Sequence, residues 1–265
     1  MRSAITILLS CILSYTNAQS PYEMSAKTDL ALMGSGLMMF TTSLILGPSQ
    51  EPLTEARIQN LDKDDIWSFD RGATDNFSQS SGVASDVFRA VSWTAPLAIL
   101  ASNRTFRQDY KVIALMSVET YLINTGITSL VKLGAGRIRP FVYNPEVDLE
   151  RKTSRSARRS FFSGHTSTSA SFAFLMLRFV TDYYDDPKLK VISWIGATSI
   201  PTLVAYLRVR AGKHYPSDVI TGFVVGGLVG YFIPELHKKK SKEAKLSLNV
   251  TSLYGTPGMR LAWKL

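Results

Sequence analysis

At 265 residues, the chain is long enough to bury one substantial core or two small ones. Apolar residues make up 45% and charged residues 19%, and the mean hydropathy of +0.05 lies between the values of soluble and polytopic membrane proteins. The formal charge of +9 raises the question of nucleic-acid binding. No recognisable nucleic-acid module accompanies the charge, so we expect no nucleic-acid partner.

The first eighteen residues have the layout of an export signal. Arg2 forms the basic region, residues 4–15 form an apolar run too short to span a bilayer comfortably, and Thr16-Asn17-Ala18 is a small-residue cleavage site. We therefore predict a signal peptide over 1–18, whose removal would also remove the only cysteine, Cys11. A lipoprotein site at Cys11 is the alternative.

Six apolar stretches of helical length follow, without strand-like alternation, and predict an all-α, six-helix bundle within a domain over 19–237. Asp29 is the expected N-cap of the first helix, and Pro48 and Pro234 are expected to end their helices. The stretches are Leu30–Gly47, Val83–Ala101, Val112–Val131, Thr168–Val180, Val191–Leu207 and Val219–Ile233.

The two longest connections, 48–82 and 141–162, are polar, and loops of that length are often functional. Between Lys132 and Ser160, eight basic residues face three acidic ones. The tail over 238–265 begins with a lysine cluster and then alternates apolar and polar residues around Tyr254-Gly-Thr-Pro-Gly, which predicts a short β-hairpin.

Two placements of the helices remain open. Most stretches fall a little short of the roughly 20 residues that a membrane span needs. If all six span, the motif-bearing loops share one side, and Arg104, Lys111 and Lys188 lie on the other, as the positive-inside rule requires. An outward-facing site needs the mature N-terminus inside, which conflicts with a cleaved signal. The alternative is a soluble exported bundle.

His214 and Asp218 lie four residues apart, a spacing at which a helix or tight turn places both on one face. A carboxylate bonded to one ring nitrogen fixes the tautomer and leaves the other nitrogen free to attack as a nucleophile. Alone, the pair is also compatible with a chance neighbour at a helix start.

Ser163-Gly164-His165 opens the fourth apolar stretch. Ser163 suits an N-cap, and Gly164 allows an oxyanion to approach the unpaired N–H groups of a helix start. His165 in that first turn can donate a proton to a leaving oxygen. Capping alone explains the same residues.

Three cations complete the set. Lys132 and Arg208 end apolar helices, where cations also stabilise the helix dipole, and Arg139 is held against Pro140. Arginine forks and a lysine point charge together suit a phosphoryl group.

In this order, Lys-x6-Arg-Pro, Ser-Gly-His and Arg-x5-His-x3-Asp resemble the signature of the type 2 phosphatidic acid phosphatases, whose superfamily includes bacterial acid phosphatases and vanadium-dependent haloperoxidases. The resemblance implies that His214 forms a phosphohistidine, Asp218 orients it, and His165 serves as acid and then base. It also implies a phosphate site without metal or cofactor. That site is made by Lys132, Arg139, Ser163, Gly164 and Arg208. Phe162 and Leu207 depart from the usual Pro and Ser.

We therefore expect a metal-independent phosphatase acting on a lipid phosphate or diphosphate, in the membrane of the cell envelope with its site outside the cytoplasm. The alternatives are a soluble periplasmic acid phosphatase, a vanadium haloperoxidase and a membrane scaffold without turnover. Trp67 and Phe69, which precede Asp70-Arg71, are candidates for reading the substrate, and the basic 151–159 loop for attracting anionic head groups. His237 matches no motif and is expected at the surface.

Overall fold

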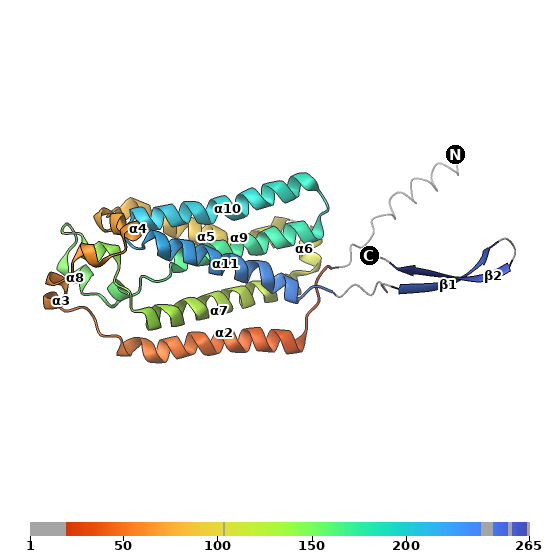
Figure 1. Cartoon of the computed structure of the whole chain (residues 1–265), viewed down its shortest axis with the longest axis horizontal. Coiled ribbons are helices and arrows are strands. Elements are labelled where there is room, and N and C mark those ends of the chain that lie inside the picture. Colours follow the sequence, from red (N-terminus) through yellow and green to blue (C-terminus); the bar gives the residue numbers. More distant parts are fainter. Residues whose placement is uncertain (1–19, 103, 240–245, 254–255, 264–265) are drawn as a thin grey trace.

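The computed structural model describes residues 20–102, 104–239, 246–253 and 256–263. The predicted signal peptide, 1–18, lies outside these residues. Within them, six long helices run side by side along the longest axis of the bundle (Figure 1). These are α2 (Ala26–Leu46), α5 (Gln79–Ser102), α7 (Tyr110–Ala135), α9 (Gly164–Tyr183), α10 (Pro187–Arg210) and α11 (Pro216–Leu236). The predicted all-α, six-helix architecture is confirmed.

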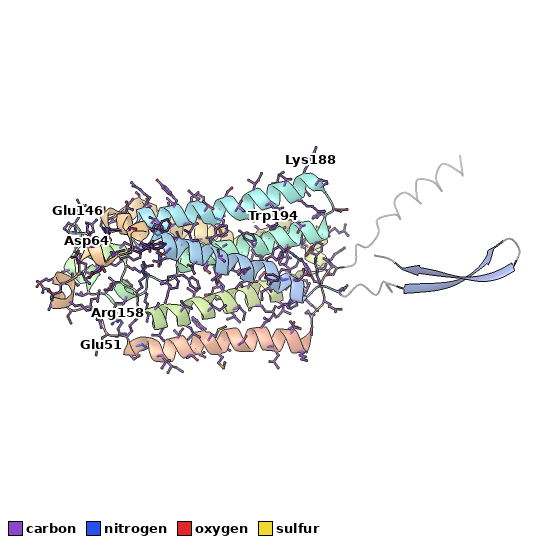
Figure 2. All side chains as sticks on the ribbon, viewed as in Figure 1. Glu51, Asp64, Glu146, Arg158, Lys188 and Trp194 are labelled. Atoms are coloured by element: carbon purple, nitrogen blue, oxygen red, sulfur yellow. The ribbon has the colours of Figure 1, made fainter. Side chains whose placement is uncertain are left out.

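Short helices and 3₁₀ turns fold the polar connections, most of them at one end of the bundle. They are η1 (Gly47–Ser49), α3 (Glu55–Gln59), η2 (Lys63–Asp65), α4 (Ser68–Arg71), η3 (Gly72–Asp75), α6 (Arg104–Gln108), η4 (Pro140–Tyr143), α8 (Leu149–Lys152) and η5 (Arg155–Arg158). Figure 2 shows Glu51, Asp64 and Arg158 at this end and Lys188 at the other.

Two predicted helix ends are wrong. Ser25, not Asp29, caps α2: its side chain accepts the N–H of Thr28, and Asp29 lies in the first turn. Pro234 does not stop α11, which continues to Leu236. A proline this close to the end removes one bond of the last turn, and the helix continues because the neighbouring helices hold it. Pro48 does follow the end of α2, in η1.

The central helix is α9, which contacts α5, α7, α10 and α11. Its first half is lined with small residues, and those from Thr166 to Ser171 are all buried. Small side chains allow neighbouring helices to approach closely, so this helix is held by packing on several sides.

The contact between α9 and α11 is a seam of small residues at four-residue spacing. Gly222, Gly226 and Gly230 of α11 lie against Ser163, Ser167 and Ser171 of α9. A Cβ at Gly222 would lie 2.6 Å from the Ser163 carbonyl oxygen, and one at Gly226 or Gly230 would come closer still to its serine carbonyl. Gly36 of α2 and Gly126 of α7 make a similar close crossing.

The outward faces are apolar. On α11, Ile220, Val224, Leu228 and Phe232 are each more than half exposed, while the glycines between them face inward. Four of the described helices are long and apolar enough to cross a membrane by length and composition: Ala26–Ser49, Gln79–Ala101, Pro187–Arg210 and Pro216–Leu236. An interior of small residues under an exterior of large apolar ones suits a lipid environment.

The tail contains two antiparallel strands, β1 (Leu246–Leu253) and β2 (Thr256–Trp263), with Leu246 opposite Trp263 and Leu253 opposite Thr256. The predicted terminal hairpin is confirmed.

Candidate active site

The predicted site residues gather at the end of the bundle that carries the long loops. Each one lies at or beside a helix terminus, so the helix packing fixes its position. Lys132 and Arg208 lie in the last turns of α7 and α10, and Arg139 precedes η4. Ser163 to His165 begin α9, and His214 and Asp218 flank the start of α11.

Backbone hydrogen bonds join these termini. The Ser163 N–H donates to the Asp218 carbonyl at 3.0 Å, which ties the start of α9 to the start of α11. The Phe141 N–H donates to the Gly212 carbonyl at 2.9 Å. Gly212 has a φ of +66° and lies so close to the Asn76 carbonyl that a side chain has no room there. The loop before His214 is therefore held from both sides.

His214 is fully enclosed, with 1% of its side chain exposed. Burial, with Lys132, Arg139 and Arg208 nearby, holds the pKa of His214 well below its ordinary value. The imidazole is therefore neutral, which is the form that a nucleophile needs.

The expected pairing of Asp218 with His214 is looser than a hydrogen bond. His214 Nδ1 lies 3.6 Å from Asp218 Oδ2 and has no hydrogen-bond partner within the described part of the chain. Asp218 is instead held by Arg137 at 2.6 Å, by the Ser160 hydroxyl at 2.5 Å and by the Tyr215 N–H at 3.0 Å. These bonds fix the carboxylate beside the ring.

The three predicted cations converge, and two of them, Lys132 and Arg139, form hydrogen bonds to backbone carbonyls and no ion pairs with carboxylates of the described residues. Lys132 Nζ donates to the carbonyls of Arg159 at 2.8 Å and Ser160 at 3.3 Å. The Arg139 guanidinium donates to the Arg159 carbonyl at 3.4 Å, and burial, reinforced by Arg159, lowers its pKa to about 10. Among the described residues, no carboxylate pairs with Lys132 or Arg139, so this charge is free to hold an anion.

Arg208 reaches α5, where it donates to the Ser85 hydroxyl at 3.3 Å and lies 3.5 Å from Asp86. Asp86 also lies 2.6 Å from His165 Nε2. Sequence reasoning missed both α5 residues. Their only signal is a Ser-Asp pair within an apolar stretch.

Ser163 is the N-cap of α9, as predicted, and accepts the Thr166 N–H at 3.4 Å. Gly164 packs closely, because a Cβ there would lie 3.2 Å from Thr128. The start of α9 thus presents backbone N–H groups at the site, with no side chain at Gly164 in the way.

A second missed group supports Asp218. Asp70 of α4 is 1% exposed, binds Arg137 at 2.7 Å and accepts the Ser217 N–H at 2.9 Å. Arg137 therefore bridges two carboxylates, one in a loop predicted to read the substrate. The neighbouring residues of this loop differ in position. Trp67 and Phe69 are exposed, whereas Asp70 is buried and helps to hold Arg137 beside Asp218.

Two other expectations change. His237 is buried, not at the surface, because Asp29 and Glu119 surround it. Although burial lowers the pKa of His237, its contacts with Glu119, Ile233 and Asp29 raise it to about 9 overall. In the basic 151–159 loop, Arg158 and Arg159 bind Glu51, Gln50 and Gly47, so part of its charge anchors the segment after α2.

Residues 113–242, which carry every predicted motif, match the PAP2 superfamily. This segment belongs to the PAP2 superfamily. The resemblance drawn from the three motifs is thereby confirmed.

Two curated relatives act on lipid A. The chain is 28% identical to the lipid A 4'-phosphatase of Porphyromonas gingivalis over 42% of this chain and 44% of that protein. It is 29% identical to the lipid A 1-phosphatase of Rhizobium etli over 47% of this chain and 52% of that protein. The chain thus spans about half the length of the curated relatives it matches.

The fold is similar to that of a transmembrane PAP2 type phosphatidylglycerolphosphate phosphatase from Bacillus subtilis. The TM-score is 0.50 at 21% identity, over 76% of this chain and 95% of that one. The superfamily match and the four membrane-length helices make this a membrane-embedded PAP2 protein.

Proposed function

We propose that this protein hydrolyses phosphate monoesters of membrane lipids through a phosphohistidine intermediate. One observation carries the proposal: a buried neutral imidazole, His214, lies among three cations, with a second imidazole, His165, close enough to interact with it. A neutral nucleophile surrounded by positive charge suits attack on an anionic phosphoryl group, whose charge would otherwise repel it.

In the first step, His214 Nε2 attacks phosphorus while the bond to the ester oxygen breaks. His165 donates a proton to the ester oxygen, and the organic part of the substrate leaves as an alcohol. Lys132, Arg139, Arg208 and the N–H groups at the start of α9 bind the phosphoryl oxygens throughout. Asp218 faces Nδ1 and stabilises the positive charge that develops on the ring.

In the second step, water attacks the phosphorus of the phosphohistidine. His165, now neutral, takes the proton from the water as the phosphorus–nitrogen bond breaks and inorganic phosphate leaves. His214 returns to its neutral form. The cations neutralise the phosphoryl charge, so the chemistry needs no metal at this end of the bundle.

The substrate class follows from the surroundings of the site. Exposed apolar faces on the helices would hold the bundle in a bilayer, and the site residues lie at the helix ends, the level at which lipid head groups would lie. Two of the curated relatives are lipid A phosphatases, so lipid A is the first substrate to test.

The test is phosphate release in detergent micelles from lipid A, phosphatidate and p-nitrophenyl phosphate, with EDTA present. We expect turnover of lipid phosphate by the wild type and loss of at least about 1,000-fold in His214→Ala. Lys188→Gln, at the far end, is the matched control and should retain full activity. Activity that survives His214→Ala contradicts the mechanism, and a strong preference for p-nitrophenyl phosphate contradicts the lipid substrate.

The intermediate has its own test. With ³²P-labelled substrate and an alkaline quench, which preserves phosphohistidine, label should accumulate on His165→Ala because its second step is slow. Label should be absent from His214→Ala. Label on His214→Ala would show that another residue is the nucleophile.

A further inference from the structure

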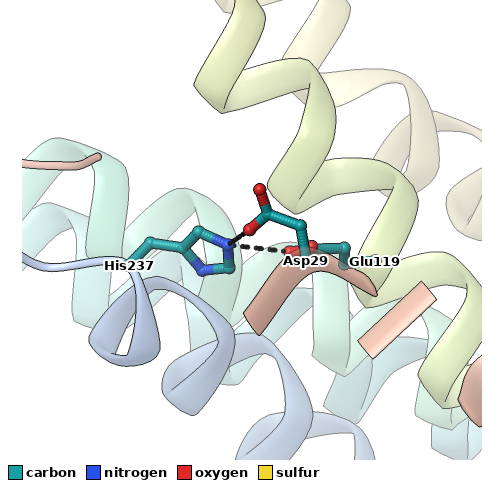
Figure 3. A group of neighbouring side chains, drawn as sticks. All are labelled: Asp29, Glu119 and His237. Carbon is teal, nitrogen blue, oxygen red and sulfur yellow. Dashed lines mark hydrogen bonds and ion pairs between the residues drawn. The ribbon is translucent and has the colours of Figure 1, made fainter. Parts of the chain in front are cut away.

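A second cluster of ionisable groups lies at the opposite end of the bundle. Figure 3 shows Asp29 of α2, Glu119 of α7 and His237, just after α11, pointing toward one another. From Asp218 to His237 the chain rises about 28 Å along α11, so this cluster takes no part in the phosphatase site. Nothing in the proposed function uses it.

The geometry is that of a ligand set. His237 Nε2 lies 3.1 Å from Asp29 Oδ1 and 3.2 Å from Glu119 Oε2. Two ligands of one tetrahedral Zn²⁺, each about 2.0–2.1 Å from the metal, are separated by about 3.3 Å. The three ligand atoms also all lie within 4.8 Å of one another.

The ring is oriented as metal-binding histidines are. His237 Nδ1 lies 2.9 Å from the Ile233 carbonyl, which can only accept a hydrogen bond, so Nδ1 carries a proton. Nε2 therefore faces the two carboxylates, and either a proton on Nε2 or a metal ion must lie between them. A backbone carbonyl behind the ring is a usual outer partner of a metal-bound histidine.

Charge balance favours a divalent metal ion over a protonated His237 as the cation at this cluster. Glu119 is fully buried, and neither of its carboxylate oxygens accepts a hydrogen bond within the described residues. No described lysine or arginine pairs with Asp29 or Glu119. A protonated His237 would leave one net negative charge in this enclosed position, whereas a divalent ion with a neutral ring leaves none.

We propose that Asp29, Glu119 and His237 bind a divalent transition-metal ion, with Zn²⁺ as the best match to one imidazole and two carboxylates. The ion would join α2, α7 and the end of α11. It would also secure the entering chain, because the Glu23 N–H donates to the His237 carbonyl at 2.8 Å and Tyr22 pairs with Lys238. Its role is structural.

The test uses the full chain in detergent, purified with a histidine-free tag, stripped with EDTA and reloaded with ZnSO₄. We expect one Zn²⁺ per chain by mass spectrometry and a higher unfolding temperature for the loaded protein. In competition with a chromogenic chelator, Glu119→Gln and His237→Gln should lose at least about 100-fold in affinity.

Two matched variants separate ligand loss from general damage. Glu235→Gln removes a carboxylate at the same end that binds Arg178 and Lys238 but adds no ligand. His165→Gln removes an imidazole at the other end. Both should retain one Zn²⁺ per chain with unchanged affinity.

Wild-type protein loaded with Co²⁺ gives a reading that does not depend on whether the variants fold. Intense visible absorption of the tetrahedral kind supports the site. If stripped wild type binds no more Zn²⁺ than Glu119→Gln, and Co²⁺ shows only its weak aqueous spectrum, a protonated His237 holds the carboxylates and the proposal is overturned. Since metal content is measured directly, these outcomes stand whether or not the protein proves to be a phosphatase.

Discussion

Asp86 approaches His165 from α5, a helix outside all three motifs. Its Oδ1 lies 2.6 Å from His165 Nε2 and 3.5 Å from the Arg208 guanidinium. Burial, followed by the charges of Arg208 and Arg89, lowers the pKa of His165. A carboxylate in the position of Asp86 orients the imidazole and opposes this lowering, because it favours the protonated form that donates a proton to a leaving group. We infer that Asp86 is a positioning residue for His165.

Asp86→Asn is expected to lower kcat roughly 10- to 100-fold on an alkyl phosphate, a part of the ~100- to 10,000-fold that general acid catalysis supplies. On p-nitrophenyl phosphate, whose leaving group needs little protonation, the loss should be about threefold or less. The ratio between the two substrates is the measurement. Equal losses on both would mean that Asp86 only supports the fold.

Asp185→Asn is the matched control for this change, since Asp185 is an exposed carboxylate paired with Lys190 at the far end. It should leave both rates unchanged.

The low pKa of His214 leads to a pH prediction. Burial, then Lys132 and Arg139, keep the ring neutral well below its ordinary pKa, so loss of the nucleophile by protonation should begin only at pH values below about 6.5. Arg139→Gln removes one cation and thereby raises the pKa of His214. The pH below which activity is lost through protonation of His214 should therefore rise by about one unit.

The measurement is the ratio of kcat/KM for Arg139→Gln and wild type across pH, on one substrate, so that the titration of the substrate phosphate cancels. The ratio should fall as the pH is lowered, and the same ratio for Lys188→Gln should stay flat. A flat ratio for Arg139→Gln would show that the cation does not set the pKa of His214.

Among individual residues, the sequence predicted which candidate site residues come together and missed the residues that hold them. His214, His165 and the three cations lie in short motifs, and the structure brings them to one end of the bundle. Asp86, Asp70 and Arg137 act across long separations in sequence, and no local pattern marks a carboxylate that reaches another helix. His237 was misplaced for the same reason, because its partners Asp29 and Glu119 come from distant helices.

Among the helices, the α9–α11 seam positions the site. The start of α9 carries Ser163 to His165, the start of α11 carries Asp218, and the glycine–serine contacts hold the two at a fixed separation. A side chain in the seam would push the helices apart and displace the catalytic ends with them.

Gly226→Ala and Gly230→Ala are therefore expected to destabilise the protein by about 1–3 kcal/mol each, the usual cost of overpacking, and to lower activity. Thermal unfolding in detergent, followed by tryptophan fluorescence, measures the first effect. Gly196→Ala on α10 is the control, since a Cβ there meets nothing within 4 Å. It should be neutral or slightly stabilising. Equal unfolding temperatures in all three variants would contradict close packing at the seam.

The number and order of the long helices could be predicted because apolar stretches of helical length are a strong local signal. Their ends could be predicted only in part. Ser163 as N-cap predicts the start of α9 at Gly164 correctly, although the apolar run begins only at Thr168, because the first turns are buried against other helices and need no large apolar residues. Pro234 lies inside α11 for a similar reason, since tertiary packing outweighs a local helix-breaking signal.

For the molecule as a whole, the two ends differ in chemistry. The phosphatase residues and long loops occupy one end, while Lys188, Lys190, Arg104 and Arg107 lie at the other, around the short connections. By the positive-inside rule, the loop-bearing end should face away from the cytoplasm.

Cysteine labelling in intact cells tests this orientation in a Cys11→Ser background. Glu51→Cys, at the loop-bearing end, should react with a membrane-impermeant maleimide. Lys188→Cys should react only after the membrane is permeabilised. The reverse pattern would place the site in the cytoplasm, and labelling of both would favour a soluble bundle.

The position of α9 also bears on how the protein is made. This helix carries Gly164 and His165 of the site, yet its serines and threonines make it too polar to be one of the four membrane-length helices. Its partners α10 and α11 leave the ribosome after it. We therefore expect stable insertion of α9 to follow the synthesis of α11, which closes the seam. The catalytic end is completed last, and a chain truncated before Gly222 should be degraded rather than accumulate as a partly active protein.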